Sequence, residues 1–186
     1  RPGYPESVRG FDAYQQLYAD ARKWLREGWL DYFTPQLYWP TTRPQQSYPV
    51  LLDWWASENV HGRHLWPGNF TSQAGGRGSG SFPVSELMEQ IRITRVNPGA
   101  TGNVHFSMKS FLSNQAGMND TLRIGPYAHP ALPPASPWLA VAKPPVPTLA
   151  ATPVADGWQL DLQAAAKPWQ WVVRLRTDSA WVTMIV

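Results

Sequence analysis

Two kinds of segment alternate over the first part of the chain. Apolar residues recur at helical spacing over residues 11–27, 48–59 and 83–95, and this pattern predicts three amphipathic helices. The helix over 11–27 is the clearest of them, because basic residues lie near its end and Gly28 follows as a C-cap. Residues 110–122 are a candidate for a fourth helix.

Short apolar and aromatic segments lie between these helices and predict strands. The first, "WLDYFTPQLYW" at residues 29–39, is typical of a strand that is buried on both faces. The second is "RHLWPGNF" at 63–70, and the third is "GNVHFSMKSF" at 102–111. A loop rich in Gly and Ser, residues 72–81, follows the second strand and is long for a connection between a strand and a helix.

The order of these elements predicts the fold class. Helices that alternate with strands at this spacing indicate parallel strands joined by helices, which is an α/β fold. Three or four such units are too few for a closed barrel of eight, so they form either a small open sheet or half of a barrel. The opening "RPGYPES" reads as the interior of a loop. We therefore predict that residues 1–125 are the C-terminal half of a (β/α)₈ TIM barrel.

The pattern changes near residue 126. Residues 126–146 carry many prolines and no periodicity, so we predict a Pro-rich linker. Beyond it, apolar and polar residues alternate at period two over 157–163 and 169–178, and an apolar segment closes the chain at 180–186. We predict that residues 147–186 form antiparallel strands of a partial β-sandwich domain.

Composition narrows the classes of function. Hydrophobic residues make up 43% of the chain, which is enough for a core, and there is no cysteine. The net charge of +3 comes from scattered basic residues, so we expect no nucleic-acid partner. No apolar run approaches the roughly 20 residues of a membrane-spanning helix. Eleven tryptophans are the unusual feature, and their flat apolar faces suit sugar rings, although core packing must account for most of them.

Candidate binding residues follow from strand direction, because ligands of parallel α/β folds lie at the C-terminal ends of the strands. We therefore predict a substrate-binding rim made of the following residues: Gln36, Tyr38, Trp39, Trp66, Asn69 and Ser107. The alternative for the first three is packing under a neighbouring loop. His105 faces either the barrel interior or the helices.

Acidic and metal-binding residues are poorly placed in the sequence. No Asp or Glu falls at a predicted C-terminal strand end, although glycoside hydrolysis needs two carboxyl groups. The acids in the predicted helices, which are Asp53, Glu58, Glu86 and Glu89, are typical of solvated helix faces. His61 and His64 lack a third ligand, and no Gly-rich phosphate loop opens a helix. We expect no metal and no cofactor.

One stretch of the sequence resembles a known family. A helix ending "D-x-R-K-W" precedes "G-W-x-D-Y-x-x-P-Q-x-Y-W" between residues 20 and 39. This pair of motifs resembles the family-10-like glycosyl hydrolases of bacteria. "LLDWW", "HLWPG" and "GNVHFSMKSF" look like the next helix and the last two strands of that family, so the resemblance spans roughly residues 1–125.

The resemblance implies more than the residues do. It implies a TIM barrel whose catalytic acid lies at the end of the fourth strand, outside this chain, so that the catalytic residues are unknown here. It also implies action on the glycan strands of peptidoglycan, a place in the bacterial cell envelope (periplasm or attached to the outer membrane), and a fibronectin-type-III-like domain after the barrel.

These inferences lead to one expected function and two alternatives. We expect part of a glycoside hydrolase, whose partners are a glycan substrate and the N-terminal half of the same barrel. The first alternative is a non-catalytic carbohydrate-binding module that uses the Trp-rich surface, and the second is a module that binds another protein.

Overall fold

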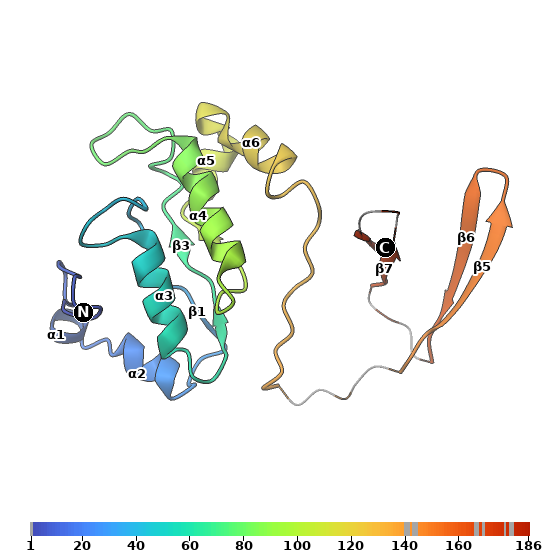
Figure 1. Ribbon diagram of the computed structural model, residues 1–186, viewed down its shortest axis with the longest axis horizontal. Helices are drawn as coiled ribbons and strands as arrows, with labels where there is room; N and C mark the ends of the chain where they lie inside the picture. Colours follow the sequence, from blue (N-terminus) through green and yellow to red (C-terminus); the bar gives the residue numbers. More distant parts are fainter. Residues whose placement is uncertain are drawn as a thin grey trace. The chain divides into compact units, whose positions relative to one another are not determined.

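The chain forms two compact units, Arg1–Ser136 and Pro137–Val186. The structure is a computed structural model that describes residues 2–139, 142, 145–165, 168, 170–176, 178 and 181–186. Figure 1 shows helices and short strands in the first unit and β-hairpins in the second. The first unit therefore contains all the residues expected to bind a ligand.

The first unit begins with two short helices in place of the single helix predicted over 11–27. Helix α1 spans Ala13–Leu17, and α2 spans Ala21–Arg26. Asp12 and Asp20 each accept hydrogen bonds from backbone N–H groups of the helix that follows them, so each acts as an N-cap. Tyr18 adopts a left-handed conformation, with φ of 54°, and ends α1. The prediction of one continuous helix was wrong because the second cap starts a new helix.

Three parallel segments form the centre of this unit. Strand β1 (Tyr32–Phe33) pairs with β2 (His64–Leu65), and β3 (Gly68–Asn69) pairs with β4 (Val104–His105), both in parallel. A bridge between Gln36 and Gly68 continues the pairing of the first segment with the second. The predicted mixed α/β fold with parallel strands is thereby confirmed, whereas the C-terminal half of a TIM barrel stays a prediction.

The regular strands are shorter than the sequence predicts. Pro35 and Pro67 lie inside the predicted strands 29–39 and 63–70, and proline has no N–H group to donate to a neighbouring strand. The third predicted strand, 102–111, is also too long, because helix α5 (Met108–Leu112) begins soon after β4.

Two longer helices cover one face of the strands. Helix α3 spans Tyr48–Glu58, and α4 spans Val84–Val96. Figure 1 shows them side by side over β1 and β3. A core forms between these helices and the strands, and its buried members are Leu37, Tyr48, Leu51, Leu52 and Leu65.

A second core lies under the Gly- and Ser-rich loop. The 3₁₀ helix η1 (Gln115–Gly117) and helix α6 (Met118–Ile124) follow α5 and pack with α4 around Phe82, Leu87 and Met118. Gly75 has a φ of +69°, and a Cβ atom there would lie 2.4 Å from Cβ of Ala116. Glycine is therefore required where the loop crosses η1.

The second unit consists of antiparallel hairpins. Strand β5 (Thr148–Val154) pairs with β6 (Gly157–Gln163), and β7 (Val172–Arg176) pairs with β8 (Trp181–Ile185). The predicted antiparallel strands are thereby confirmed. None of the described residues of this unit is fully buried, so the sandwich stays a prediction.

The segment before the hairpins carries no regular structure where it is described. From 125 to 147 no described residue belongs to a helix or a strand. Of the predicted linker, residues 140, 141, 143 and 144 lie outside the described residues, and so do 169, 177 and 180 of the predicted strands. Among the described helices, none combines the length and the apolar character needed to cross a bilayer.

Candidate functional site

Aromatic rings gather at the C-terminal ends of the parallel strands. The ring of Tyr38 stacks on that of Phe70, with 4.7 Å between centroids, and the Phe106 ring lies 6.0 Å from Tyr38. A Cβ atom at Gly68 would lie 3.2 Å from Cε1 of Tyr38, so glycine lets the phenol ring approach the strand closely. Burial raises the pKa of the Tyr38 hydroxyl, which keeps this group a neutral hydrogen-bonding partner.

A cavity of about 530 Å³ adjoins this cluster, and we call it the loop groove. It lies between the loop that follows Trp39 and the Gly- and Ser-rich loop. Its lining combines aromatic rings with hydroxyl, amide and guanidinium groups: Tyr38, Trp39, Pro40, Thr42, Arg43, Pro44, Phe70, Gln73, Ser79, Gly80 and Ser81. Such a mixture of flat apolar faces and polar edges is typical of a site for a polar ring.

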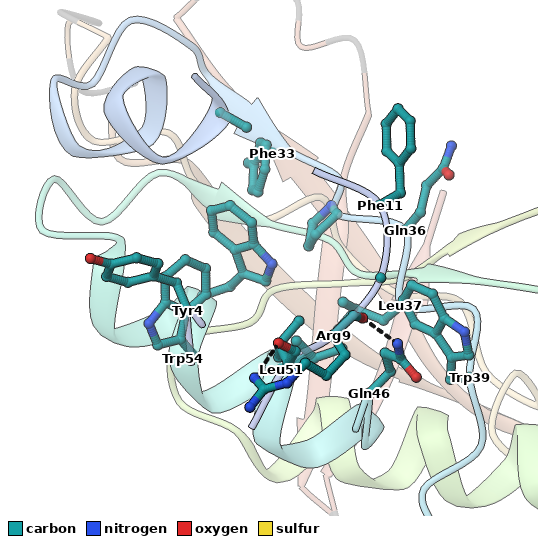
Figure 2. Close-up of a pocket in the computed structure, with 15 residues that line it drawn as sticks. Tyr4, Arg9, Phe11, Phe33, Gln36, Leu37, Trp39, Gln46, Leu51 and Trp54 are labelled. Atoms are coloured by element: carbon teal, nitrogen blue, oxygen red, sulfur yellow. Dashed lines mark hydrogen bonds between the residues drawn. The ribbon is translucent and has the colours of Figure 1, made fainter. Parts of the chain in front are cut away.

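A second cavity, of about 460 Å³, lies beside β1 and is shown in Figure 2; we call it the aromatic cavity. The N-terminal segment, β1 and α3 contribute to its lining, which includes Tyr4, Phe11, Phe33, Gln36, Trp39, Trp54 and Trp55. Gln46, in the segment just before α3, donates a hydrogen bond from Nε2 to the carbonyl oxygen of Arg9. This bond connects that segment to the N-terminal segment.

The two cavities divide the predicted residues of the first strand. Gln36 lines the aromatic cavity, Tyr38 lines the loop groove, and Trp39 lines both. Trp39 is 36% exposed, so its indole is available to a ligand. Neither lining contains an aspartate or a glutamate among the described residues.

The loop that begins at Pro40 is anchored on helix α4. The Glu86 carboxylate accepts hydrogen bonds from the backbone N of Thr41 at 2.7 Å and from its Oγ1 at 3.0 Å. Gln90 donates from Nε2 to the Trp39 carbonyl oxygen at 3.3 Å and to Glu86 at 3.0 Å. The expectation of a solvated helix face was therefore wrong for Glu86, which positions the rim. It was also wrong for Glu58, which is 6% exposed.

Asn69 is placed in a buried polar network between the strands and the helices. Its side chain is 0% exposed, and its Nδ2 donates to Gln90 Oε1 at 2.9 Å and to the Tyr48 hydroxyl at 3.3 Å. Asn103 donates to Asn69 Oδ1 at 2.8 Å, and the Tyr48 hydroxyl lies 2.7 Å from Thr94 Oγ1. The structure thus puts Asn69 behind the rim, where it connects through Gln90 to Trp39.

Trp66 and Ser107 line neither cavity. The Trp66 indole stacks on Tyr32, with 4.8 Å between centroids, and its Nε1 donates to Thr101 Oγ1 at 2.8 Å. Ser107 lies against Ser72, whose Oγ accepts from the Ser107 backbone N at 3.2 Å. Ser107 therefore contacts the start of the Gly- and Ser-rich loop. Direct binding of substrate by either residue stays a prediction.

Two of the histidines, His64 and His105, contact other side chains of the protein. His105 faces the helices, and its Nε2 lies 2.7 Å from the Tyr127 hydroxyl. Burial lowers the pKa of His105 to about 4, so it is neutral at pH 7. The ring nitrogens of His64 lie 3.2 Å from Thr101 Oγ1 and 3.0 Å from Ser136 Oγ. Within the described part of the chain, no group of three or more acidic, histidine or cysteine side chains could hold a metal ion.

Sequence reasoning missed the residues that complete the rim. Phe70 and Phe106 directly follow β3 and β4, and their place one residue beyond a strand is a signal that could have found them. Glu86 and Gln90 are four residues apart on one face of a helix, but nothing in the sequence pairs them with Thr41 and Trp39.

Tyr38, Trp39 and Phe70 of the rim fall within a segment that matches a known family. Residues 4–73 match the family described as Glycosyl hydrolase-like 10. The chain is 39% identical to glycosyl hydrolase YngK of Bacillus subtilis (strain 168) over 147 residues, which cover 75% of this chain and 28% of that protein. It is 52% identical to glycosyl hydrolase DigH of Escherichia coli (strain K12) over 49 residues, 26% of this chain and 11% of that protein.

These matches show what the first part of the chain is similar to. Residues 4–73, which include the motif between residues 20 and 39, resemble the family described as Glycosyl hydrolase-like 10. The chain spans less than a third of the length of either relative.

Proposed function

We propose that this chain is part of a glycoside hydrolase that acts on the β-linked amino sugars of bacterial cell-wall glycan strands, and that it supplies the substrate-binding rim. The observation that carries the proposal is the loop groove, where aromatic rings and polar side chains meet at the C-terminal ends of parallel strands. The family match to residues 4–73 covers Tyr38 and Trp39 and supports the same class of activity.

Each rim residue has a proposed role. The exposed indole of Trp39 stacks on a sugar face, and the Tyr38 hydroxyl lies near the reacting carbon. Gln36 lines the neighbouring cavity and hydrogen-bonds a hydroxyl or an N-acetyl group there. Asn69 acts through Gln90, which holds the Trp39 backbone.

The catalytic carboxyl groups are proposed to come from the N-terminal half of the same barrel. The strands support this partner. Successive side chains of a strand point to opposite faces, so those that do not face α3 and α4 point to the other, open face of the strands. This face includes Tyr32, Trp66, Val104 and Phe106, and also His64, which pairs with Tyr32 and contacts Ser136. Tyr32 and Phe106 are 56% and 53% exposed, so a second set of strands would bury a substantial apolar surface.

The same proposal extends to location and to the second unit. A substrate in the cell wall puts the protein in the bacterial cell envelope. The antiparallel hairpins β5–β6 and β7–β8 are proposed to belong to a fibronectin-type-III-like domain. A carbohydrate-binding module without catalysis is the second candidate, and the lack of an acidic side chain in either lining favours it.

The test compares two exposed tryptophans. Trp39→Ala in the full-length protein should weaken binding of peptidoglycan glycan strands about 10-fold or more, because a stacked ring is lost. Trp158→Ala, which removes a 67% exposed indole from β6, is the matched control and should leave binding unchanged. Binding is measured by calorimetry, and cleavage is measured by the release of new reducing ends.

The outcomes separate the candidates. Loss of both binding and cleavage in Trp39→Ala supports the hydrolase, and binding without cleavage by the unaltered protein supports the module. Trp39→Phe keeps a stacking ring and should retain most of the affinity. Equal binding by Trp39→Ala and the unaltered protein would reject the rim.

A further inference from the structure

Among the described residues, one charged side chain lines the loop groove. Arg43 contributes a guanidinium group, and the other lining residues are neutral. The carboxylate that anchors the loop is that of Glu86. Both of its oxygens accept hydrogen bonds from Thr41. Arg77, in the facing loop, lies outside the lining. The charge that the lining itself offers to a ligand is therefore the guanidinium of Arg43.

The backbone around Arg43 is held in place. Its N–H donates to the Pro40 carbonyl oxygen at 3.1 Å, and its own carbonyl oxygen accepts from the Gln46 N at 3.3 Å. Pro40 and Pro44 fix their own φ angles, and the Thr41–Glu86 contact ties the turn to α4. A turn that is fixed before binding loses little entropy when a ligand arrives.

The guanidinium itself is available. Arg43 is exposed, and the salt bridges formed by the described residues involve Arg22, Arg26 and Arg92 but not Arg43. Arginine presents a planar set of donors that matches a carboxylate in a bidentate arrangement. In the same lining, Tyr38 and Trp39 offer flat faces to a ring.

We propose that the loop groove binds a sugar residue that carries a carboxylate, with the ring against Trp39 and the carboxylate on Arg43. The inference rests on the proposed function and refines its substrate class. It makes Arg43 a residue that determines specificity, since a neutral amino sugar would contact the aromatic rings but leave the guanidinium without a partner.

The experiment uses two probes that differ only in charge. One is a tetrasaccharide of alternating N-acetylglucosamine and N-acetylmuramic acid, and the other is the same tetrasaccharide with its carboxylates converted to amides. The full-length protein should bind the acid about 10-fold more tightly than the amide, because the charge-assisted hydrogen bonds are lost with the amide. Arg43→Gln should bind both probes equally, at the affinity that the unaltered protein shows for the amide.

Two further variants complete the design. Arg43→Lys keeps the charge without the bidentate fork and should keep part of the preference. Arg77→Gln removes an equal charge from the facing loop and should keep all of it. Far-UV circular dichroism checks that each variant is folded.

The results distinguish this inference from the function on which it rests. If the unaltered protein binds both probes equally, or if Arg77→Gln abolishes the preference as fully as Arg43→Gln does, the role of Arg43 is wrong while the rim stands. If neither probe binds the unaltered protein, the proposed function fails and this inference fails with it. Full loss of the acid preference in Arg43→Gln, together with an unchanged preference in Arg77→Gln, supports the proposal.

Discussion

The two units of the chain bury their apolar residues to different extents. In the first unit, Leu52 and Leu65 are 0% exposed, because helices α3 and α4 cover one face of the parallel strands. In the second unit, Leu149 and Trp158 on β5 and β6 are 61% and 67% exposed. Apolar segments thus predict strands in both units, but the burial of their side chains depends on the element that covers the strands.

The largest expected difference concerns matched leucines. Leu52→Ala should lower the free energy of unfolding by about 3 kcal/mol, because it leaves a cavity in a closed core. Leu149→Ala removes the same atoms from an exposed strand and should change stability by less than about 0.5 kcal/mol. Urea denaturation followed by circular dichroism measures both. Similar losses in the two variants would show that the hairpins bury Leu149.

The second comparison concerns amide side chains. Asn69→Ala should cost about 2 kcal/mol, since the buried Gln90 Oε1 loses the donor Asn69 Nδ2 and Asn103 Nδ2 loses its shortest hydrogen bond. Gln159→Ala breaks only exposed contacts to Asp161 and should be nearly neutral. Because Gln90 also holds Trp39, Asn69→Ala should weaken glycan binding as well. If Asn69→Ala loses stability but keeps full affinity for glycan, Asn69 does not help to position the rim.

The smallest expected effect concerns acids and depends on pH. Burial alone would raise the pKa of Glu58, but hydrogen bonds from Arg22 and Arg26 hold it below its ordinary value of 4.5. Because the folded pKa is depressed, the stabilisation is complete above about pH 4.5 and is lost as the pH falls through the folded pKa. Glu58→Gln should cost about 1 kcal/mol at pH 7, since both arginines are partly exposed.

The control for that prediction is Asp161→Asn on the exposed strand β6, which should change stability little. Thermal unfolding between pH 3 and pH 7 provides the measurement. The gap between Glu58→Gln and the unaltered chain should close at low pH, because a protonated glutamate resembles glutamine. Titration of His105 affects both proteins equally and cancels from this difference. A gap that stays constant down to pH 3 would contradict the role of the ion pairs.

The sequence predicted the order of elements better than their limits. Helical spacing identified α3 and α4, since their buried faces repeat every three or four residues. The break at Tyr18 was missed, because Asp20 reads equally well as a helical residue or as a cap. Strand lengths were overestimated, since apolar character continues through Pro35 although pairing does not.

The candidate site shows the same division. Strand direction identified Tyr38 and Trp39, which line the loop groove. Strand direction could not show that Asn69 lies behind the rim. Its hydrogen-bond partners Gln90 and Asn103 come from other parts of the chain, so no local pattern indicates that it is buried. The contact of Glu86 with Thr41 joins residues that are 45 positions apart, and no local pattern encodes such a pair.

The position of Trp39 in the walls of both cavities makes its indole a partition. Removing the ring would change the shape of two compartments at once, so Trp39→Ala would alter occupancy beside Gln36 as well as beside Tyr38. Under the proposed function, such a partition would set where one repeating unit of the glycan ends and the next begins, so the size of the side chain at residue 39 would set the spacing of the sugars.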